Sequence, residues 1–232
     1  MRQAGVLAIV AALLSTAAMA DSLEIGPTRV QMIGAERAAT ITIRNSDAAP
    51  ANIQIRTMDW SQIDGADQYA PSRVLMASPP QVALAPGESQ VIRLVAENLP
   101  TGAEEKSFRL VIDQIPTDQA PGATGVRTAI RALVPVFVAP STADRPRLRW
   151  RASRSAEGVT LTATNEGNAH ERLIAVSVGT GGRNVGEPIE GYILPKAQRS
   201  WSIRGVPAAA RTLQIAGEGD FGEVRADVPL AP

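Results

Sequence analysis

The sequence has no cysteine, one histidine and few aromatic residues, and each shortage excludes a class of protein. Without cysteine, neither disulfides nor thiolate metal ligands are available, so the hydrophobic core alone must hold the fold. A serine triad would have to use His170, and no Gly-x-Ser-x-Gly elbow is present. Equal numbers of basic and acidic residues, 23 of each, argue against the basic surface of a nucleic-acid-binding protein.

Three short motifs that could carry chemistry are each incomplete. His170 lies in a polar stretch, and we expect a solvated loop side chain because zinc needs several nitrogen or sulfur ligands. Residues 64–67, Asp-Gly-Ala-Asp, lack the further acids of an EF-hand loop and predict a turn. Residues 179–182 lack the third glycine of a dinucleotide fingerprint and predict a hairpin loop. We therefore expect no enzyme, no cofactor and no metal site.

The N-terminus has the three parts of a secretory signal peptide. Arg2 supplies a positive charge, residues 6–14 are apolar, and residues 18–20, Ala-Met-Ala, form a small-residue cleavage pattern. The apolar run is shorter than the roughly 20 residues needed to span a bilayer. We expect residues 1–20 to be removed, so that an exported chain begins at Asp21.

Polar and apolar residues alternate in many short segments, whereas helix signals are nearly absent. Alternation with a period of two predicts strands that have one buried face. Glycine, proline and asparagine fall between these segments, a pattern typical of a β-sandwich or barrel. The expected strands include residues 39–44, 52–56, 89–95, 159–164, 173–178, 200–203 and 213–216.

A polar stretch bounded by prolines, residues 141–146, predicts a linker. It separates residues 21–140 from residues 147–232, and each segment has about the size of an immunoglobulin-like domain of roughly 100 residues. The predicted fold class is therefore all-β, with two immunoglobulin-like β-sandwich domains joined by a short linker.

A series of motifs in residues 21–140 is more specific than this general pattern. In order they are Trp60-Ser61-Gln62, Pro79-Pro80, Leu84-Ala85-Pro86-Gly87, Val91-Ile92-Arg93 and Pro135-Val136-Phe137-Val138. This series resembles the periplasmic pilus (fimbrial) assembly chaperones. The first and last motifs resemble the archaic subclass found with spore-coat-protein-U-type subunits. The second domain matches more weakly, through Leu194-Pro195 and residues 219–222, Gly-Asp-Phe-Gly.

The resemblance implies donor-strand complementation, a form of β-augmentation. A pilus subunit lacks one strand of its sandwich, and the chaperone lends it a strand until the next subunit supplies its own. The expected partners are a pilus or spore-coat-U-like subunit and an outer-membrane usher, and the expected location is the periplasm. No nucleic acid, small-molecule substrate or cofactor is implied.

The family lends the last strand of its first domain, which corresponds here to residues 126–138. On one face of that strand the resemblance places four side chains in the groove of the subunit: Val126, Thr128, Ile130 and Ala132. We expect the later residues of the same face to pack in the chaperone's own core: Val134, Val136 and Val138.

The family also anchors the C-terminal carboxylate of the subunit with a pair of basic residues. Arg29 matches the arginine of this pair, but the family's lysine aligns with Pro135, so the pair is incomplete. Arg109, on the preceding strand, and Arg131 are the candidates to replace that lysine.

Two acids, Glu105 and Asp220, match the family's interdomain salt-bridge cluster. The arginine that lies between them in the family aligns here with Ala139, and we expect both acids to be structural.

Two other functions remain open from the residues alone. One is an exported structural or surface subunit with immunoglobulin-like domains, although residues 228–232 form a tail too short and proline-broken to serve as a donor segment. The other is a carbohydrate-binding module, which scattered tryptophans at positions 60, 150 and 201 do not favour.

Overall fold

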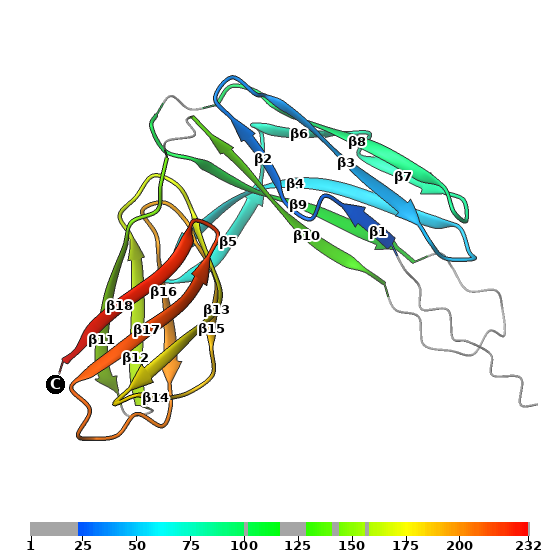
Figure 1. Ribbon diagram of the computed structural model, residues 1–232. Helices are drawn as coiled ribbons and strands as arrows, with labels where there is room; N and C mark the ends of the chain where they lie inside the picture. Colours follow the sequence, from blue (N-terminus) through cyan, green and yellow to red (C-terminus); the bar gives the residue numbers. More distant parts are fainter. Residues whose placement is uncertain (1–22, 100–101, 117–128, 141–143, 156–157, 232) are drawn as a thin grey trace, which may run out of the picture.

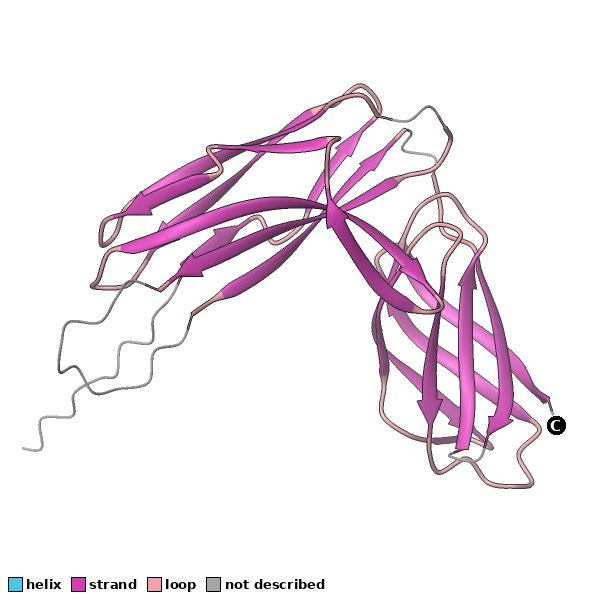
Figure 2. Ribbon diagram, turned by 180° about the vertical axis from the view of Figure 1, so that it is seen from behind, coloured by secondary structure: helices cyan, strands magenta, loops and turns pink. Residues whose placement is uncertain are grey.

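The protein is built from strands in two β-sandwich domains, set at an angle to one another (Figure 1). The computed structural model describes residues 23–99, 102–116, 129–140, 144–155 and 158–231. These residues contain no helix, as the view from behind also shows (Figure 2). Accordingly, nothing within these ranges is a helix able to cross a membrane. The expected signal peptide lies outside the described residues.

The first domain has two sheets that enclose one core. One sheet has the order β1 (Leu23–Gly26), β3 (Ala38–Asn45), β8 (Ser89–Ala96), β6 (Leu75–Ser78). The other has the order β2 (Val30–Ile33), β10 (Arg131–Ala139), β9 (Lys106–Ile115), β4 (Ala51–Ile63), β5 (Ala66–Pro71), with β7 (Gln81–Leu84) beside β4. Alternate residues such as Ile41, Leu94 and Leu110 are fully buried between the sheets, so period-two alternation supplies the core.

The second domain curves one continuous set of strands around a separate core. Leu161, Val176 and Leu213 are fully buried in that core. The strand order is β14 (Arg183–Asn184), β13 (Glu171–Thr180), β17 (Thr212–Gly219), β18 (Gly222–Ala231), β11 (Leu148–Ser155), β12 (Gly158–Asn165), β16 (Gln198–Ile203), and β15 (Ile189–Ile193) pairs with β13.

The segments in which alternation predicts strands all lie within observed strands, and both expected turns are confirmed. Asp64 and Gly65, between β4 and β5, have φ values of 52° and 81°. Gly181 and Gly182, between β13 and β14, have φ values of 58° and 77°. Positive φ at both central residues is the requirement of a tight type I′ hairpin, which explains the residue choice without any bound ion or phosphate.

The longest first-domain strand, β4, changes the face that it buries along its length. Ala51, Ile53 and Ile55 point into the core of the first domain, whereas Trp60, five positions after Ile55, is buried on the opposite face. The second half of β4 twists out of its sandwich with β5 and reaches the second domain (Figure 1). One strand therefore contributes to the first core and then to the contact between the domains.

Candidate functional site

Strand β10 has an unpaired edge over its first half. It pairs with β9 in antiparallel fashion from Arg131 to Val138, but the parallel partner β2 covers only Val136–Ala139. Residues 131–135 therefore have no partner on that second edge within the described part of the chain. Unpaired N–H and C=O groups in such a row form a template for one more strand.

The structure describes only part of the predicted donor segment. Val126 and Thr128 lie outside the described residues. Ile130 is half-buried just before β10, and its carbonyl accepts the N–H of Gln114 at 2.9 Å. Ala132 is half-buried and packs against the core of the first domain.

The later half of the same β10 face is internal. Val134, Val136 and Val138 are buried in the first core, as expected. A single apolar face therefore runs from the core of the first domain to Ala132, and the period of two continues it to Ile130. On the other face, Leu133 has 46 % of its surface exposed.

A buried carboxylate orients the beginning of β10. Asp113 lies directly opposite Arg131 in the ladder, and its two oxygens bind Arg131 and Arg56, the latter at 2.5 Å. Burial raises the pKa of Asp113, but the two guanidinium groups outweigh it and hold that pKa below its ordinary value. No local pattern marks Asp113, because its arginine partners lie on other strands, 57 and 18 residues away in the sequence.

The two arginines predicted as a carboxylate anchor both lie at the contact between the domains. Arg29, in the bend between β1 and β2, forms an ion pair with Asp220 in the turn between β17 and β18, and 36 % of its side chain remains exposed. Arg109 lies directly opposite Pro135 in the ladder of β9 and β10. It therefore occupies the place next to the position where the resemblance expects a lysine.

An aromatic surface holds Arg109. Its guanidinium carbon lies 3.7 Å from the ring centre of Trp60 and 5.3 Å from that of Tyr192, while its Nε is buried without a hydrogen-bond partner. Stacking on two rings stabilises a cation by about 0.5–2 kcal/mol. Because Tyr192 belongs to the second domain, this cation is positioned by both domains.

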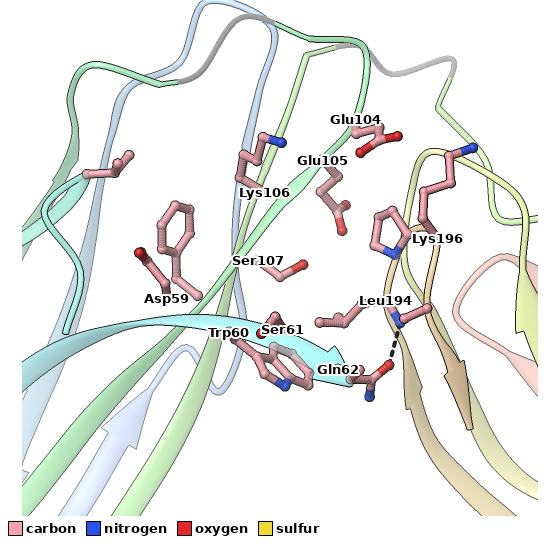
Figure 3. A pocket seen from close by; sticks show the side chains of 14 residues that line it. Asp59, Trp60, Ser61, Gln62, Glu104, Glu105, Lys106, Ser107, Leu194 and Lys196 are labelled. Carbon is pink, nitrogen blue, oxygen red and sulfur yellow. Dashed lines mark hydrogen bonds between the residues drawn. The ribbon is translucent and has the colours of Figure 1, made fainter. Parts of the chain in front are cut away.

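Gln62 ties β4 to the backbone of the second domain. Its Nε2 donates to the carbonyl of Tyr192 at 2.9 Å, and its Oε1 accepts the N–H of Leu194 at 3.0 Å, so the amide completes β15 like one more peptide group. Figure 3 shows Gln62 facing Leu194. The Nε2 also donates to Asp67 at 2.8 Å, and the same carboxylate accepts from Trp60 Nε1. The Trp-Ser-Gln motif is therefore an interdomain clasp.

A cavity of about 310 Å³ lies beside this clasp, between the two domains (Figure 3). Its lining includes Ser61, Glu104, Lys106, Ser107 and Lys196. Acids and lysines both line it, so its charge gives no preference for one class of ion. No group of three or more acidic or histidine side chains that could hold a metal ion occurs among the residues that the structure describes.

The expectation that His170 is a solvated loop residue is wrong. The side chain is 0 % exposed, its ring stacks on Phe137 with centres 3.6 Å apart and planes 8° from parallel, and its Nδ1 lies 2.7 Å from Glu105 Oε1. Its Nε2 lies 3.6 Å from Asp220 Oδ2. The loop between β12 and β13 is polar because it packs against a carboxylate of the other domain, which the local sequence cannot reveal.

The interdomain cluster is thus complete, although its central residue differs from the one that the resemblance predicts. Glu105 and Asp220 come together as structural acids, as expected, and His170 lies between them. The position aligned with the family's arginine, Ala139, is buried. The motifs that carry the resemblance meet here, because Trp60, Phe137 and Leu194 form one buried cluster between the domains.

Comparison with protein families gives one match. Residues 22–144, just over half of the chain, match the family described as pili and flagellar-assembly chaperone, PapD N-terminal domain. No curated protein matches the sequence.

Three solved structures illustrate how widely the fold recurs. The CsuC–CsuE chaperone–tip adhesion subunit pre-assembly complex, from archaic chaperone-usher Csu pili of Acinetobacter baumannii, matches with a TM-score of 0.71 and 20 % identity over 91 % of this chain and 100 % of that chain. The SafA pilin–SafB chaperone complex of Salmonella enterica matches with a TM-score of 0.65 and 21 % identity over 92 % and 99 %. The E. coli chaperone DraB matches with a TM-score of 0.62 and 22 % identity over 90 % and 97 %. All three share the two-domain fold.

Proposed function

The chain belongs to the family of pili and flagellar-assembly chaperones, which are not enzymes, and on this basis we propose that it acts on pilus subunits by donor-strand complementation. It works in the periplasm, where it binds a subunit whose sandwich lacks one strand, keeps that subunit folded and delivers it to an outer-membrane usher. The folding of the subunit supplies the free energy, so no cofactor takes part.

The observation that carries this proposal is the unpaired edge of β10 over residues 131–135. A subunit strand that pairs with this edge would satisfy backbone N–H and C=O groups on both chains. The same pairing would cover the open groove of the subunit, whose exposed apolar surface otherwise promotes aggregation.

The side chains that enter the groove belong to the face that continues the chaperone's core. We assign this role to Val126, Thr128, Ile130 and Ala132. The half-buried state of Ile130 and Ala132 supports it, because each keeps apolar surface that a partner can cover. Each aliphatic side chain that becomes fully buried contributes about 1.5–3 kcal/mol.

The C-terminal carboxylate of the subunit binds Arg29 and Arg109. Arg109 stands beside Pro135 on the adjacent strand, and its stacking on Trp60 and Tyr192 fixes the direction of a guanidinium that can bind a carboxylate. Arg29 is partly exposed and already binds one carboxylate, that of Asp220. A guanidinium has five N–H donors, so Arg29 can bind the carboxylate of the subunit without releasing Asp220.

The client is a subunit of the archaic, spore-coat-U-like class. The Csu complex, in which a chaperone from an archaic chaperone-usher system is bound to a tip adhesion subunit, supports this narrower assignment. The SafA–SafB complex shows a pilin bound to another chaperone of the same fold.

The test uses the full tagged chain, expressed in the periplasm of a pilus-producing bacterium and purified with its co-purifying subunit. We expect a complex of equal stoichiometry, in which the backbone N–H groups of Arg131 and Leu133, on the open edge of β10, become protected from hydrogen exchange. Ile130→Asp should weaken subunit binding by at least about a hundredfold, because it removes a buried aliphatic group and places a charge in an apolar groove.

A matched control is Val91→Asp, the same kind of change on β8, where Val91 has 52 % of its surface exposed in the other sheet. Val91→Asp should leave the affinity for the subunit within about twofold of wild type, since an exposed substitution costs little. Equal binding by wild type and Ile130→Asp, or protection of another edge with residues 131–135 unchanged, would refute the donor-strand assignment.

A further inference from the structure

Glu105, Asp220, His170 and Arg29 form a charged contact between the domains, here called the joint. It contains two acids but only one permanently charged base, Arg29. The Glu105 side chain is 2 % exposed, and its partners are the backbone N–H of His170 at 3.2 Å and Nδ1 of His170 at 2.7 Å. No lysine or arginine forms an ion pair with Glu105 in the described part of the chain. An ionised carboxylate buried without a cation is strongly unfavourable. The short contact between Glu105 and Nδ1 therefore favours the positively charged form of His170.

The surroundings of the second ring nitrogen, Nε2, also favour the charged form of His170. Nε2 is buried without a hydrogen-bond partner, and Asp220 Oδ2 lies 3.6 Å from it. If His170 were neutral and donated Nδ1–H to Glu105, its Nε2 lone pair would face a second carboxylate. In the imidazolium form both nitrogens carry a proton, and each points toward an anion.

We propose that His170 is an imidazolium cation in the folded protein and that its proton fixes the orientation of the two domains. With that charge the joint is balanced, because the anions Glu105 and Asp220 face the cations His170 and Arg29. Without it the joint holds one unpaired negative charge at the boundary between two domains. The inference does not depend on the proposed function.

The remaining charged groups around the ring are engaged elsewhere. Glu171, the next residue on β13, accepts the N–H of Arg172 at 3.0 Å. Asp144 accepts from Asn168 Nδ2 at 2.6 Å. The Arg145 guanidinium lies 5.6 Å from the ring of Phe221, whose edge faces His170 at 5.9 Å. The acids within 4 Å of the ring nitrogens of His170 are Glu105 and Asp220, and Asp220 also binds Arg29.

The stacked ring of Phe137 adds a further preference for the charged form. A cation over an aromatic face is attracted by the ring quadrupole, most strongly where water is excluded. Phe137 belongs to β10, whereas Asp220 belongs to the turn between β17 and β18. The proton on His170 therefore holds three segments of the chain together: the approach to β9, strand β10 and that turn.

The direction of the pH dependence follows. Histidine ordinarily exchanges its proton near pH 6.5. Loss of the proton removes the positive charge that faces Glu105 and Asp220, so the contact between the domains is weaker in the deprotonated protein.

The charge can be measured without any variant. His170 is the only histidine, so a long-range ¹H–¹⁵N correlation spectrum of the full chain contains one imidazole. We expect two protonated ring nitrogens at neutral pH. A neutral ring, with one protonated and one bare nitrogen, would overturn the proposal.

The effect on the domains is measured by small-angle X-ray scattering from about pH 6 to about pH 9, a range around the ordinary histidine value. We expect the radius of gyration of wild type to increase once the imidazole signals show loss of the proton. His170→Gln should have the larger radius at every pH. Glu223→Gln, an exposed acid three residues after Asp220, should behave as wild type. Deprotonation without any change in scattering would refute the role of the proton in domain orientation.

Discussion

Replacing Gln62 with glutamate tests whether the clasp of β4 sets the relation between the domains. The substitution keeps the oxygen that accepts from Leu194 but replaces the donor that binds the Tyr192 carbonyl and Asp67. A neutral hydrogen bond contributes about 1 kcal/mol and a bond to a charged group about 1.5–3 kcal/mol. The new carboxylate also faces Asp67, a like charge. Together these losses come to about 3 kcal/mol, or roughly a hundredfold in the equilibrium between closed and open joints.

The assay combines small-angle scattering, which measures the separation of the domains, with urea unfolding followed by circular dichroism. Gln68→Glu is the matched control, because Gln68 is exposed on the same hairpin, opposite Ser61, and carries the same change in charge. We expect Gln62→Glu to widen the joint and lower stability, and Gln68→Glu to do neither. If the two variants scatter and unfold alike, the clasp does not hold the domains and the reasoning is wrong.

Two further changes separate charge from packing. Arg109→Met keeps an aliphatic side chain on Trp60 but removes the cation, and we expect about tenfold weaker subunit binding by calorimetry. Arg131→Met is the control and should have a smaller effect, because Arg131 already binds Asp113. Equal losses of affinity in the two variants would mean that the carboxylate of the subunit binds elsewhere. Asp113→Asn should cost about 1 kcal/mol at neutral pH, since its arginine partners are largely exposed. Because the pKa of Asp113 is lowered in the folded chain, its contribution to stability is present above about pH 3.9 and is lost as pH falls through the lower folded value. The free energies of unfolding of wild type and variant, measured in urea, should therefore converge in acid. A difference in stability that persists in acid would contradict this.

Local patterns predicted the fold well because strands and tight turns are local features. The alternation in residues 39–44 or 159–164 is visible over a few positions, and both hairpins follow from glycine where φ is positive. The cores follow from the same alternation, as Val134, Val136 and Val138 show.

Contacts between the domains were beyond local reasoning. His170 looked solvated because its neighbours in sequence are polar, yet its environment consists of Glu105 and Phe137, which lie in another domain. Gln62 was recognised within a motif, but its role depends on the carbonyl of Tyr192, 130 residues away. The donor residues remain predictions, and Val126 and Thr128 lie outside the described residues.

The change of buried face along β4 has a mechanical consequence. With 13 residues at about 3.3 Å each, β4 is roughly 43 Å long. Its first half packs in the core of the first domain, and Gln62 binds its other end to the second domain. The covalent connection near residue 140 and the contacts of Glu105 with His170 and of Arg29 with Asp220 are further, separate attachments. A body joined at one point swivels, whereas a body joined at two points turns only if one of the attachments bends or detaches. A load applied to the second domain is therefore transmitted along β4 directly into the sheet that contains β10.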